Sequence, residues 1–168
     1  MMRLDEKPIE TLSFRILGEA VPEGSVRSFY VPKAHKTVTK HQNESELRAW
    51  RIRVALEAQS ALKDQPWTMD GTSAYTIHVN FIIPRPASVA SHKRLHPIVK
   101  PDLDKLIRAI DDALTGILFN DDCQIVSVIC SKDYNDEMRA GAYINVSRYA
   151  NAFDRPRKKK DEGEGINE

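Results

Sequence analysis

The sequence predicts an α+β fold in which a small mixed sheet packs on about two helices, in two layers. The prediction rests on four stretches with the composition of β-strands and two longer stretches with apolar residues at helical spacing. The chain of 168 residues is long enough for one domain with a real core. We expect that domain at residues 11–150, with a flexible N-terminus (1–10) and a disordered tail (151–168) whose basic and acidic residues balance.

The composition is that of an ordinary soluble protein, with 41% hydrophobic and 29% charged residues. No apolar run approaches the roughly 18 residues that a membrane-crossing helix needs, and residues 1–8 lack the apolar segment of a secretory signal. We therefore expect a cytoplasmic protein with no membrane partner. The net charge of +1 gives no general attraction to nucleic acid, so any polyanion site must be a local patch.

The N-terminal half should hold a strand, an irregular segment and a helix. Residues 11–17, TLSFRIL, alternate apolar and polar side chains as a strand does. The segment 18–40 contains several Pro and Gly residues and predicts a loop or an irregular hairpin. From Asn43 or Ser45 to about Leu62, apolar residues recur every three or four positions, which predicts an amphipathic helix capped by one of these two polar residues.

The middle of the chain predicts a core strand, a loop and a second helix. Residues 73–84, rich in β-branched and aromatic side chains, predict a buried strand that ends at Pro84. Residues 85–100 show no periodicity and predict a mobile loop. Leu103 to about Thr115 carries one apolar stripe, with Gly116 placed to end the helix.

Two further strands are expected near the C-terminus, at residues 124–134 and 141–149, joined by a polar loop. Their closeness in sequence predicts an antiparallel hairpin. Cys123 and Cys130 are seven residues apart in what we take to be one strand, so they should face opposite sides and stay free thiols.

Carboxylates provide the clearest candidates for chemistry: Asp102 and Asp104 before the second helix, and Asp122 after it, next to Asp121. Mg²⁺ takes hard oxygen ligands and is commonly held by one or two carboxylates together with substrate phosphate oxygens. A purely structural explanation also exists, because Asp is favoured at helix N-caps and first turns. Asn120–Asp122 is equally typical of a turn before a strand.

The charge around the first pair favours a polyanion site. Between residues 85 and 108 there are six Lys or Arg residues against two Asp residues. Such cations could bind a nucleic acid backbone while carboxylates hold a metal that activates water, although Lys and Arg in loops are often simply solvated. The candidate DNA-binding residues are Arg85, Lys93, Arg94, Lys100 and Lys105, with Arg27 in the basic N-terminal segment beside Phe29 and Tyr30.

Residues 100–126, KPDLDKLIRAIDDALTGILFNDDCQIV, resemble the signature of the RusA family of Holliday junction resolvases, which is often phage-borne. The shared pattern has an Asp-x-Asp opening a helix, an Asp-Ala-Leu within it, and an Asp-Asp-x-Gln leading into a strand. GEAVPEGSVRSF (18–29) is similar to the family's strand-to-loop element, and Lys132 suits the lysine that follows in the next strand. The resemblance spans about residues 12–148 and suggests a phage or prophage protein.

The resemblance implies that Asp102, Asp104 and Asp122 are catalytic, metal-binding carboxylates, with Asp121 a neighbour. It also implies a Mg²⁺-dependent (or Mn²⁺-dependent) homodimer that nicks two opposed strands of a four-way DNA junction in recombination and repair, close to the bacterial nucleoid. Lys132 joins the DNA-binding candidates on the same ground.

Arg108 departs from the family pattern, which has a catalytic lysine at this position. An arginine stays protonated, so Arg108 could stabilise phosphate charge but could not transfer protons. Lys105 could substitute for the lysine. Because Asp104 and Arg108 stand at i and i+4, a surface ion pair between them is the structural alternative.

Chain geometry limits how Asp122 can join the other two carboxylates. A helix from Asp104 to Thr115 rises about 18 Å, and the seven residues from Gly116 to Asp122 reach at most about 23 Å when extended. Asp122 therefore returns to the helix start only if this segment runs back nearly straight. Otherwise Asp122 of a second subunit must complete the site.

Two other functions remain open on the sequence. The first is a junction-binding architectural protein that has lost catalysis, with Arg108 as the mark of that loss. The second is another Asp-x-Asp metal enzyme that transfers phosphate on a nucleotide or sugar phosphate. Asp112, in the helix, is interpreted as structural.

Overall fold

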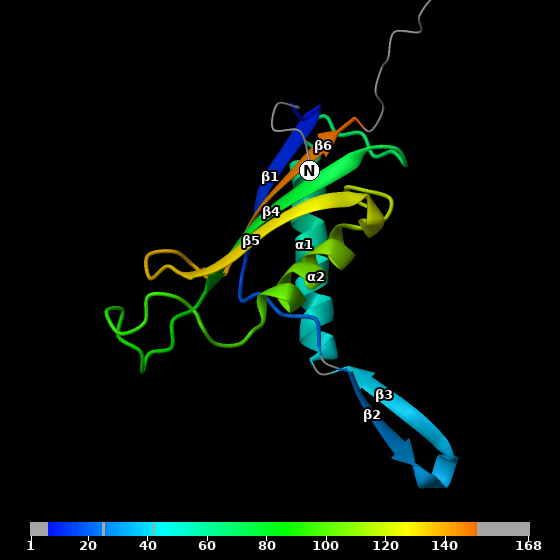
Figure 1. Cartoon of the computed structure of the whole chain (residues 1–168), viewed down its shortest axis with the longest axis vertical. Coiled ribbons are helices and arrows are strands. Elements are labelled where there is room, and N and C mark those ends of the chain that lie inside the picture. The colour runs from blue at the N-terminus through cyan, green and yellow to red at the C-terminus, as the bar shows by residue number, and fades with distance from the viewer. Residues whose placement is uncertain (1–6, 25, 42, 151–168) are drawn as a thin grey trace, which may run out of the picture.

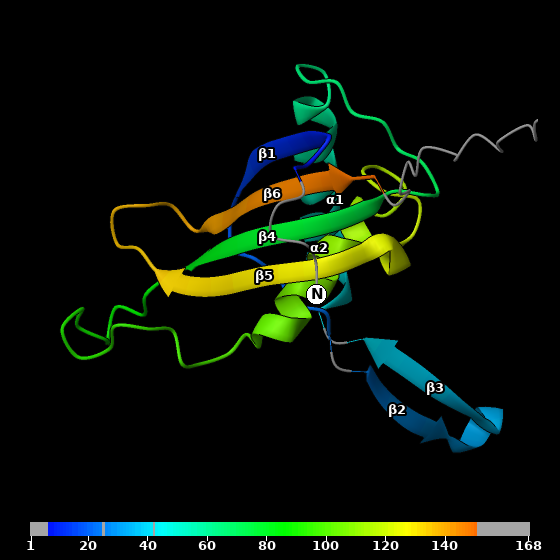
Figure 2. The ribbon, with the colours of Figure 1, turned by 45° about the horizontal axis from the view of Figure 1, so that its top comes forward.

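The computed structural model describes residues 7–24, 26–41 and 43–150, and it has two layers. A mixed four-stranded sheet forms one layer, and helices α1 (Glu44–Ala61) and α2 (Leu103–Leu114) cover one of its faces (Figures 1 and 2). The predicted α+β class is confirmed. The flexible N-terminus and disordered tail fall mostly outside the described residues, so they stay predictions.

The sheet has the order β1-β6-β4-β5. Strand β6 (Gly141–Tyr149) lies between β1 (Glu10–Leu17) and β4 (Ala74–Ile83) and is antiparallel to both. Strand β5 (Ile125–Tyr134) is parallel to β4 and forms one edge of the sheet. The chain passes from β4 through α2 to β5, the crossover that a parallel pair requires.

The predicted hairpin between the last two strands is wrong. Strands β5 and β6 do not pair, because β4 lies between them. The helix that connects β4 to β5 makes these two strands parallel neighbours, and β6 then occupies the remaining edge of β4. Burial agrees with this arrangement, since Ile144 and Val146 in β6 and Ile77 and Val79 in β4 belong to one core.

The two helices follow the sequence prediction closely. In α1 the buried side chains are Leu47, Trp50, Val54 and Ala58, on one stripe. Asn43 is the N-cap residue, but its side chain makes no capping hydrogen bond. Helix α2 ends at Leu114, and Gly116 adopts a φ of +78°, which glycine tolerates best.

A second, two-stranded sheet projects from this body. Strands β2 (Val26–Val31) and β3 (Lys36–His41) form a regular antiparallel hairpin around the 3₁₀ turn Pro32–Ala34. In Figures 1 and 2 it extends beyond the N-terminal end of α1. The segment expected to be a loop or irregular hairpin is therefore a well-formed hairpin arm.

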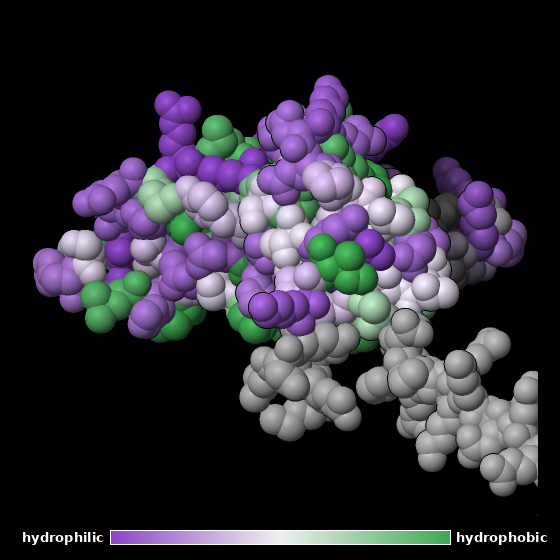
Figure 3. All heavy atoms as spheres, turned by 90° about the horizontal axis from the view of Figure 1, so that it is seen from above, coloured by the Kyte–Doolittle hydropathy of each residue, from purple (hydrophilic) through white to green (hydrophobic). Residues whose placement is uncertain are grey.

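Both cysteines are free, as expected, although Cys123 lies in a short 3₁₀ turn (η2, Asp122–Gln124) rather than in the strand with Cys130. No helix in the described part of the chain is long and apolar enough to cross a membrane. The end of the molecule seen in Figure 3 is mainly polar, with small apolar areas between the charged side chains.

Candidate active site

The start of α2 presents two exposed carboxylates, Asp102 and Asp104. Asp102 is the N-cap residue, with an extended backbone (φ −71°, ψ 138°), yet its side chain accepts no capping hydrogen bond. Its carboxylate instead lies 3.2 Å from the ammonium of Lys105. Asp104 follows in the first turn, and both Asp side chains are exposed. Because an Asp cap normally accepts a backbone N–H of the first turn, capping alone does not explain Asp102.

Lys132 fixes the backbone just before this pair. Its side chain extends from β5, and the ammonium donates hydrogen bonds to the carbonyls of Val99 (2.6 Å) and Pro101 (2.8 Å). These carbonyls end the long loop that leads into α2. Lys132 therefore ties the position of Asp102 to the rigid sheet.

The outward side of α2 carries further charged residues in line with Asp104. Asp104, Arg108 and Asp111 are four and three residues apart, so they lie along one side of the helix. No ion pair joins Arg108 to Asp104 within the described residues. The surface ion pair between Asp104 and Arg108, the structural alternative for Arg108, is thus not formed. The Arg108 side chain is exposed.

Asp111 is the most perturbed carboxyl on this helix. Burial, followed by the negative charges of Asp112 and Asp122, raises the pKa of Asp111 to about 7. Its Oδ1 atom is buried without a hydrogen-bond partner within the described residues. The charge of Asp111 also adds to burial in raising the pKa of the Cys130 thiol. Asp111 therefore lies between α2 and β5, close to Asp122.

Asp112 plays the structural part expected of it. Its carboxylate and that of Glu23 both form ion pairs with Arg51 of α1. This arrangement ties α2 to α1 and to the segment that leads into the β2–β3 hairpin. The backbone N–H of Glu23 also donates to the carbonyl of Lys105 (2.9 Å), so the base of the hairpin is fixed to the first turn of α2.

Asp121 and Asp122 sit in the turn before β5, and only Asp121 is used by the turn. Asp121 accepts a hydrogen bond from the Cys123 backbone N–H (2.9 Å). Hydrogen bonding from the Cys123 side chain, followed by this backbone bond, holds the pKa of Asp121 below its usual value. The carboxylate of Asp122 is exposed beside α2. The predicted turn is therefore present, and it uses the carboxylate of Asp121 but not that of Asp122.

Gln124 fixes this turn to the body of the protein. Its Oε1 accepts from the backbone N–H groups of Asn120 (2.9 Å) and Asp121 (3.2 Å). Its Nε2 donates to the carbonyls of Asp70 (2.8 Å) and Ser73 (3.1 Å). One side chain therefore joins the Asp121–Asp122 turn to the turn that begins β4.

The Asp70 turn is itself firmly held. Hydrogen bonds from Ser73 and Thr72 lower the pKa of Asp70 well below its usual value. The guanidinium of Arg148 donates to Asp70 (3.0 Å) and to Glu10 (2.8 Å), which links β6 and β1 to the same point. Gln124 thus attaches the Asp122 turn to one of the best-connected parts of the sheet.

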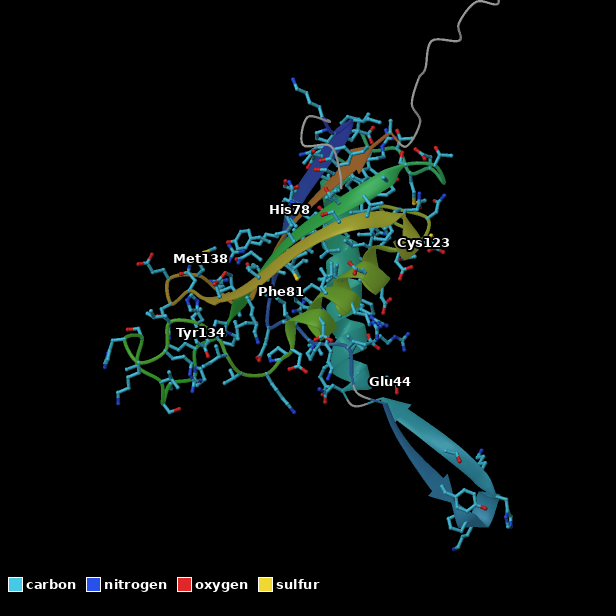
Figure 4. The ribbon with its side chains drawn as sticks, viewed as in Figure 1. Glu44, His78, Phe81, Cys123, Tyr134 and Met138 are labelled. Atoms are coloured by element: carbon cyan, nitrogen blue, oxygen red, sulfur yellow. The ribbon has the colours of Figure 1, made fainter. Side chains whose placement is uncertain are left out.

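The structure places the three candidate ligands at two ends of α2. After the helix the chain turns back on itself, because Ile117 and Leu118 donate to the carbonyl of Leu114 (3.0 Å each) and Gly116 donates to Phe119 (2.7 Å). Asp122 then lies beside Asp111, which is seven residues, or about 10 Å of helix rise, beyond Asp104. Figure 4 shows Cys123 and Tyr134 at opposite ends of β5. Within the described residues, no three His, Cys, Asp or Glu side chains come together to hold a metal ion.

The candidate DNA-binding residues differ in how exposed they are and in whether they contact other residues of the chain. Arg85 is only 13% exposed, pairs with Asp136 (2.9 Å), and lies over the ring of Tyr134 at 4.3 Å. It therefore shapes the base of the loop 84–102. Lys93 and Lys100 are exposed on that loop and Arg94 is half-buried. The side chain of Arg27 lies outside the described part of the chain.

Comparison with known proteins identifies the family. The family model described as Endodeoxyribonuclease RusA matches residues 19–147, a range that contains all the candidate site residues. The chain is also 28% identical to the uncharacterized protein YqaN of Bacillus subtilis (strain 168) over 149 residues, covering 81% of this chain and 96% of that protein.

The chain belongs to the RusA endodeoxyribonuclease family.

Two residues that matter to this RusA-family site were missed as individual candidates. Asp111 was not among the candidate residues, since a helical stripe does not reveal that a neighbouring strand will bury an outward position. Gln124 was visible as the Gln of the Asp-Asp-x-Gln pattern, and an amide at a fixed distance from a turn is the signal for a backbone anchor.

Proposed function

We propose that this RusA-family protein is a divalent-metal-dependent endonuclease that resolves four-way DNA junctions by paired, symmetric nicks, in DNA recombination and repair. One observation carries the proposal: two exposed carboxylates, Asp102 and Asp104, stand at the start of α2, and the Asp102 side chain makes no capping hydrogen bond. A segment with no acidic residue, from Pro84 to Pro101, leads directly into them.

The donor set suits Mg²⁺ or Mn²⁺. Two carboxylates with oxygen ligands, completed by phosphate oxygens and water, are a common way for proteins to hold Mg²⁺. Asp102 and Asp104 supply those two carboxylates in one chain, and Asp122 is the third candidate. When bound, the ion supplies an activated water and neutralises charge on the scissile phosphate.

The chain's own residues would position the DNA and the ligands. Arg108, one turn after Asp104, offers a permanent positive charge to a phosphate oxygen. Lys132 and Gln124 hold the two ends of the site through backbone hydrogen bonds. Asp102 and Asp104 then keep their positions when a charged substrate approaches.

Basic segments on two sides of α2 support DNA as the substrate. The loop before Asp102 carries Lys93, Arg94 and Lys100. The hairpin of residues 26–41 holds four Lys or Arg residues and no Asp or Glu, and its base is fixed to the first turn of α2 through Glu23. A polyanion bound at the carboxylates can therefore contact cations on both sides.

Metal removal gives the direct test. Wild-type protein with Mg²⁺ is expected to cut a labelled four-way junction at paired positions, and an excess of chelator should abolish cutting while leaving junction binding. A linear duplex of equal length is the matched control substrate and should remain uncut. Junction binding without nicks at any Mg²⁺ or Mn²⁺ concentration would instead favour the architectural function.

A further inference from the structure

The hairpin arm formed by β2 and β3 projects away from the core of the protein. Its two strands pair only with each other, and no residue of the arm belongs to the hydrophobic core of the described residues. Figures 1 and 4 show the arm beyond the N-terminal end of α1, with Glu44, the first residue of that helix, at the base of the arm. Core packing therefore does not explain which side chains the arm carries.

Tyr30 stands near the outer end of this arm and is 58% exposed. It is the only aromatic residue among the large hydrophobic side chains that are exposed in the described part of the chain. Its hydroxyl lies 3.4 Å from Nδ1 of His35, a turn residue with a φ of +46°. Across the hairpin, Tyr30 pairs with Thr37, which has a smaller side chain. The aromatic ring is thus held near the tip of the arm and presented to solvent.

Positive charges flank Tyr30 along the arm. Lys33 and Lys36 are exposed on either side of His35, and residues 26–41 contain four Lys or Arg residues and no Asp or Glu. Proteins that bind single-stranded nucleic acid combine cations for the phosphate backbone with aromatic rings on which bases stack. In a continuous duplex both faces of each base are already covered by neighbouring bases. The arm therefore suits DNA in which a base has an uncovered face.

The base of the arm is fixed to the helix that carries the candidate carboxylates. The backbone N–H of Glu23 donates to the carbonyl of Lys105 in α2 (2.9 Å), and Arg51 forms ion pairs with both Glu23 and Asp112. Each strand of the arm has six residues, which span about 20 Å. This length equals about six base pairs of B-DNA. The tip can therefore contact DNA within about six base pairs of a phosphate held at the start of α2.

We propose that Tyr30 stacks on an uncovered base at the branch point of a DNA junction, and that this contact makes the protein select branched DNA over linear duplex. The inference rests on the proposed function and deepens it, because it names the residue that recognises the branch. When the arms of a four-way junction spread apart, each base pair at the crossing has one face without a stacking neighbour. A tyrosine ring can cover that face, whereas a linear duplex offers such a face only at its ends.

Binding to DNA in the presence of a chelator tests this contact separately from cutting. Full-length Tyr30→Leu keeps an apolar side chain in the strand but loses the ring. It is expected to bind a four-way junction about tenfold more weakly than the wild type does. Its affinity for a linear duplex of equal length should stay close to that of the wild type. Tyr30→Phe keeps the ring and should retain the preference for the junction.

Lys33→Ala is the matched control at the same end of the arm. It removes a charge that attracts any DNA backbone, so it should weaken binding to junction and duplex to the same extent and reduce the salt dependence of both. A 2-aminopurine base at the branch point reports stacking directly, because stacking lowers its fluorescence. The fluorescence of the bound junction should be lower with the wild type and Y30F than with Y30L.

Two results would overturn the inference. One is equal junction affinity of Y30L and the wild type, and the other is an equal loss of junction preference in Y30L and Y30F. Junction nicking by the wild type in either case would leave the proposed function intact. Conversely, a wild type whose junction preference depends on the Tyr30 ring, but which never nicks with Mg²⁺ or Mn²⁺, would support the inference and overturn the proposed cleavage.

Discussion

Asp104→Asn is expected to abolish metal-dependent nicking of four-way junctions while leaving junction affinity close to that of the wild type. The substitution keeps the size of the side chain and removes the negative charge that a divalent cation needs. A metal ion is worth several kcal/mol of transition-state stabilisation, so the loss of about 4 kcal/mol corresponds to a rate about a thousandfold lower. Single-turnover cleavage at saturating protein measures this rate separately from binding.

The control for this variant is Asp64→Asn, the same chemical change at an exposed position just after α1. It should cut junctions as the wild type does. Asp104 is also exposed, so D104N should unfold at nearly the wild-type temperature. Wild-type nicking by D104N would show that Asp104 is only a first-turn helix residue and would remove the central support for the proposed site.

The helices were predictable because each carries its signal locally. In α2, Leu106, Ile110 and Leu114 mark one buried stripe, and Gly116 marks the end. The pairing of β5 was not predictable in the same way, because closeness in sequence favours a hairpin with β6. Only the crossover through α2 and the nearly continuous burial of β4 show that β4 lies between them.

In the candidate site, too, the features with local sequence signals were predictable and the long-range contacts were not. The Asp-x-Asp pair and the Asp-Asp turn are local patterns, and the structure places both at the ends of α2 as discrete features. Seven residues can bring Asp122 back to the start of α2 only along a nearly straight segment. The turn formed by Leu114, Gly116 and Phe119 removes that route. Long-range anchors such as Lys132 on Pro101 have no local signature at all.

Gln124→Ala is expected to slow junction nicking by tenfold or more and to lower the free energy of unfolding by about 1–3 kcal/mol. The side chain makes four hydrogen bonds to backbone groups, at 2.8 to 3.2 Å. Alanine leaves the N–H groups of Asn120 and Asp121 without this partner and frees the turn that carries Asp122. Rate as a function of Mg²⁺ concentration is the measurement, and half-maximal activity should move to higher Mg²⁺.

Two further variants distinguish a loss of Asp122 positioning in Q124A from a general loss of protein stability. Ile144→Val should cost about 1 kcal/mol and leave the Mg²⁺ dependence unchanged, because Ile144 is buried within strand β6 of the sheet and not in the turn that carries Asp122. Gln124→Glu keeps an oxygen for Asn120 and Asp121 and loses both donations to Asp70 and Ser73. It should fall between the wild type and Q124A. An unchanged Mg²⁺ dependence in Q124A would mean that Gln124 serves only the fold, since a displaced Asp122 must weaken a site that uses it.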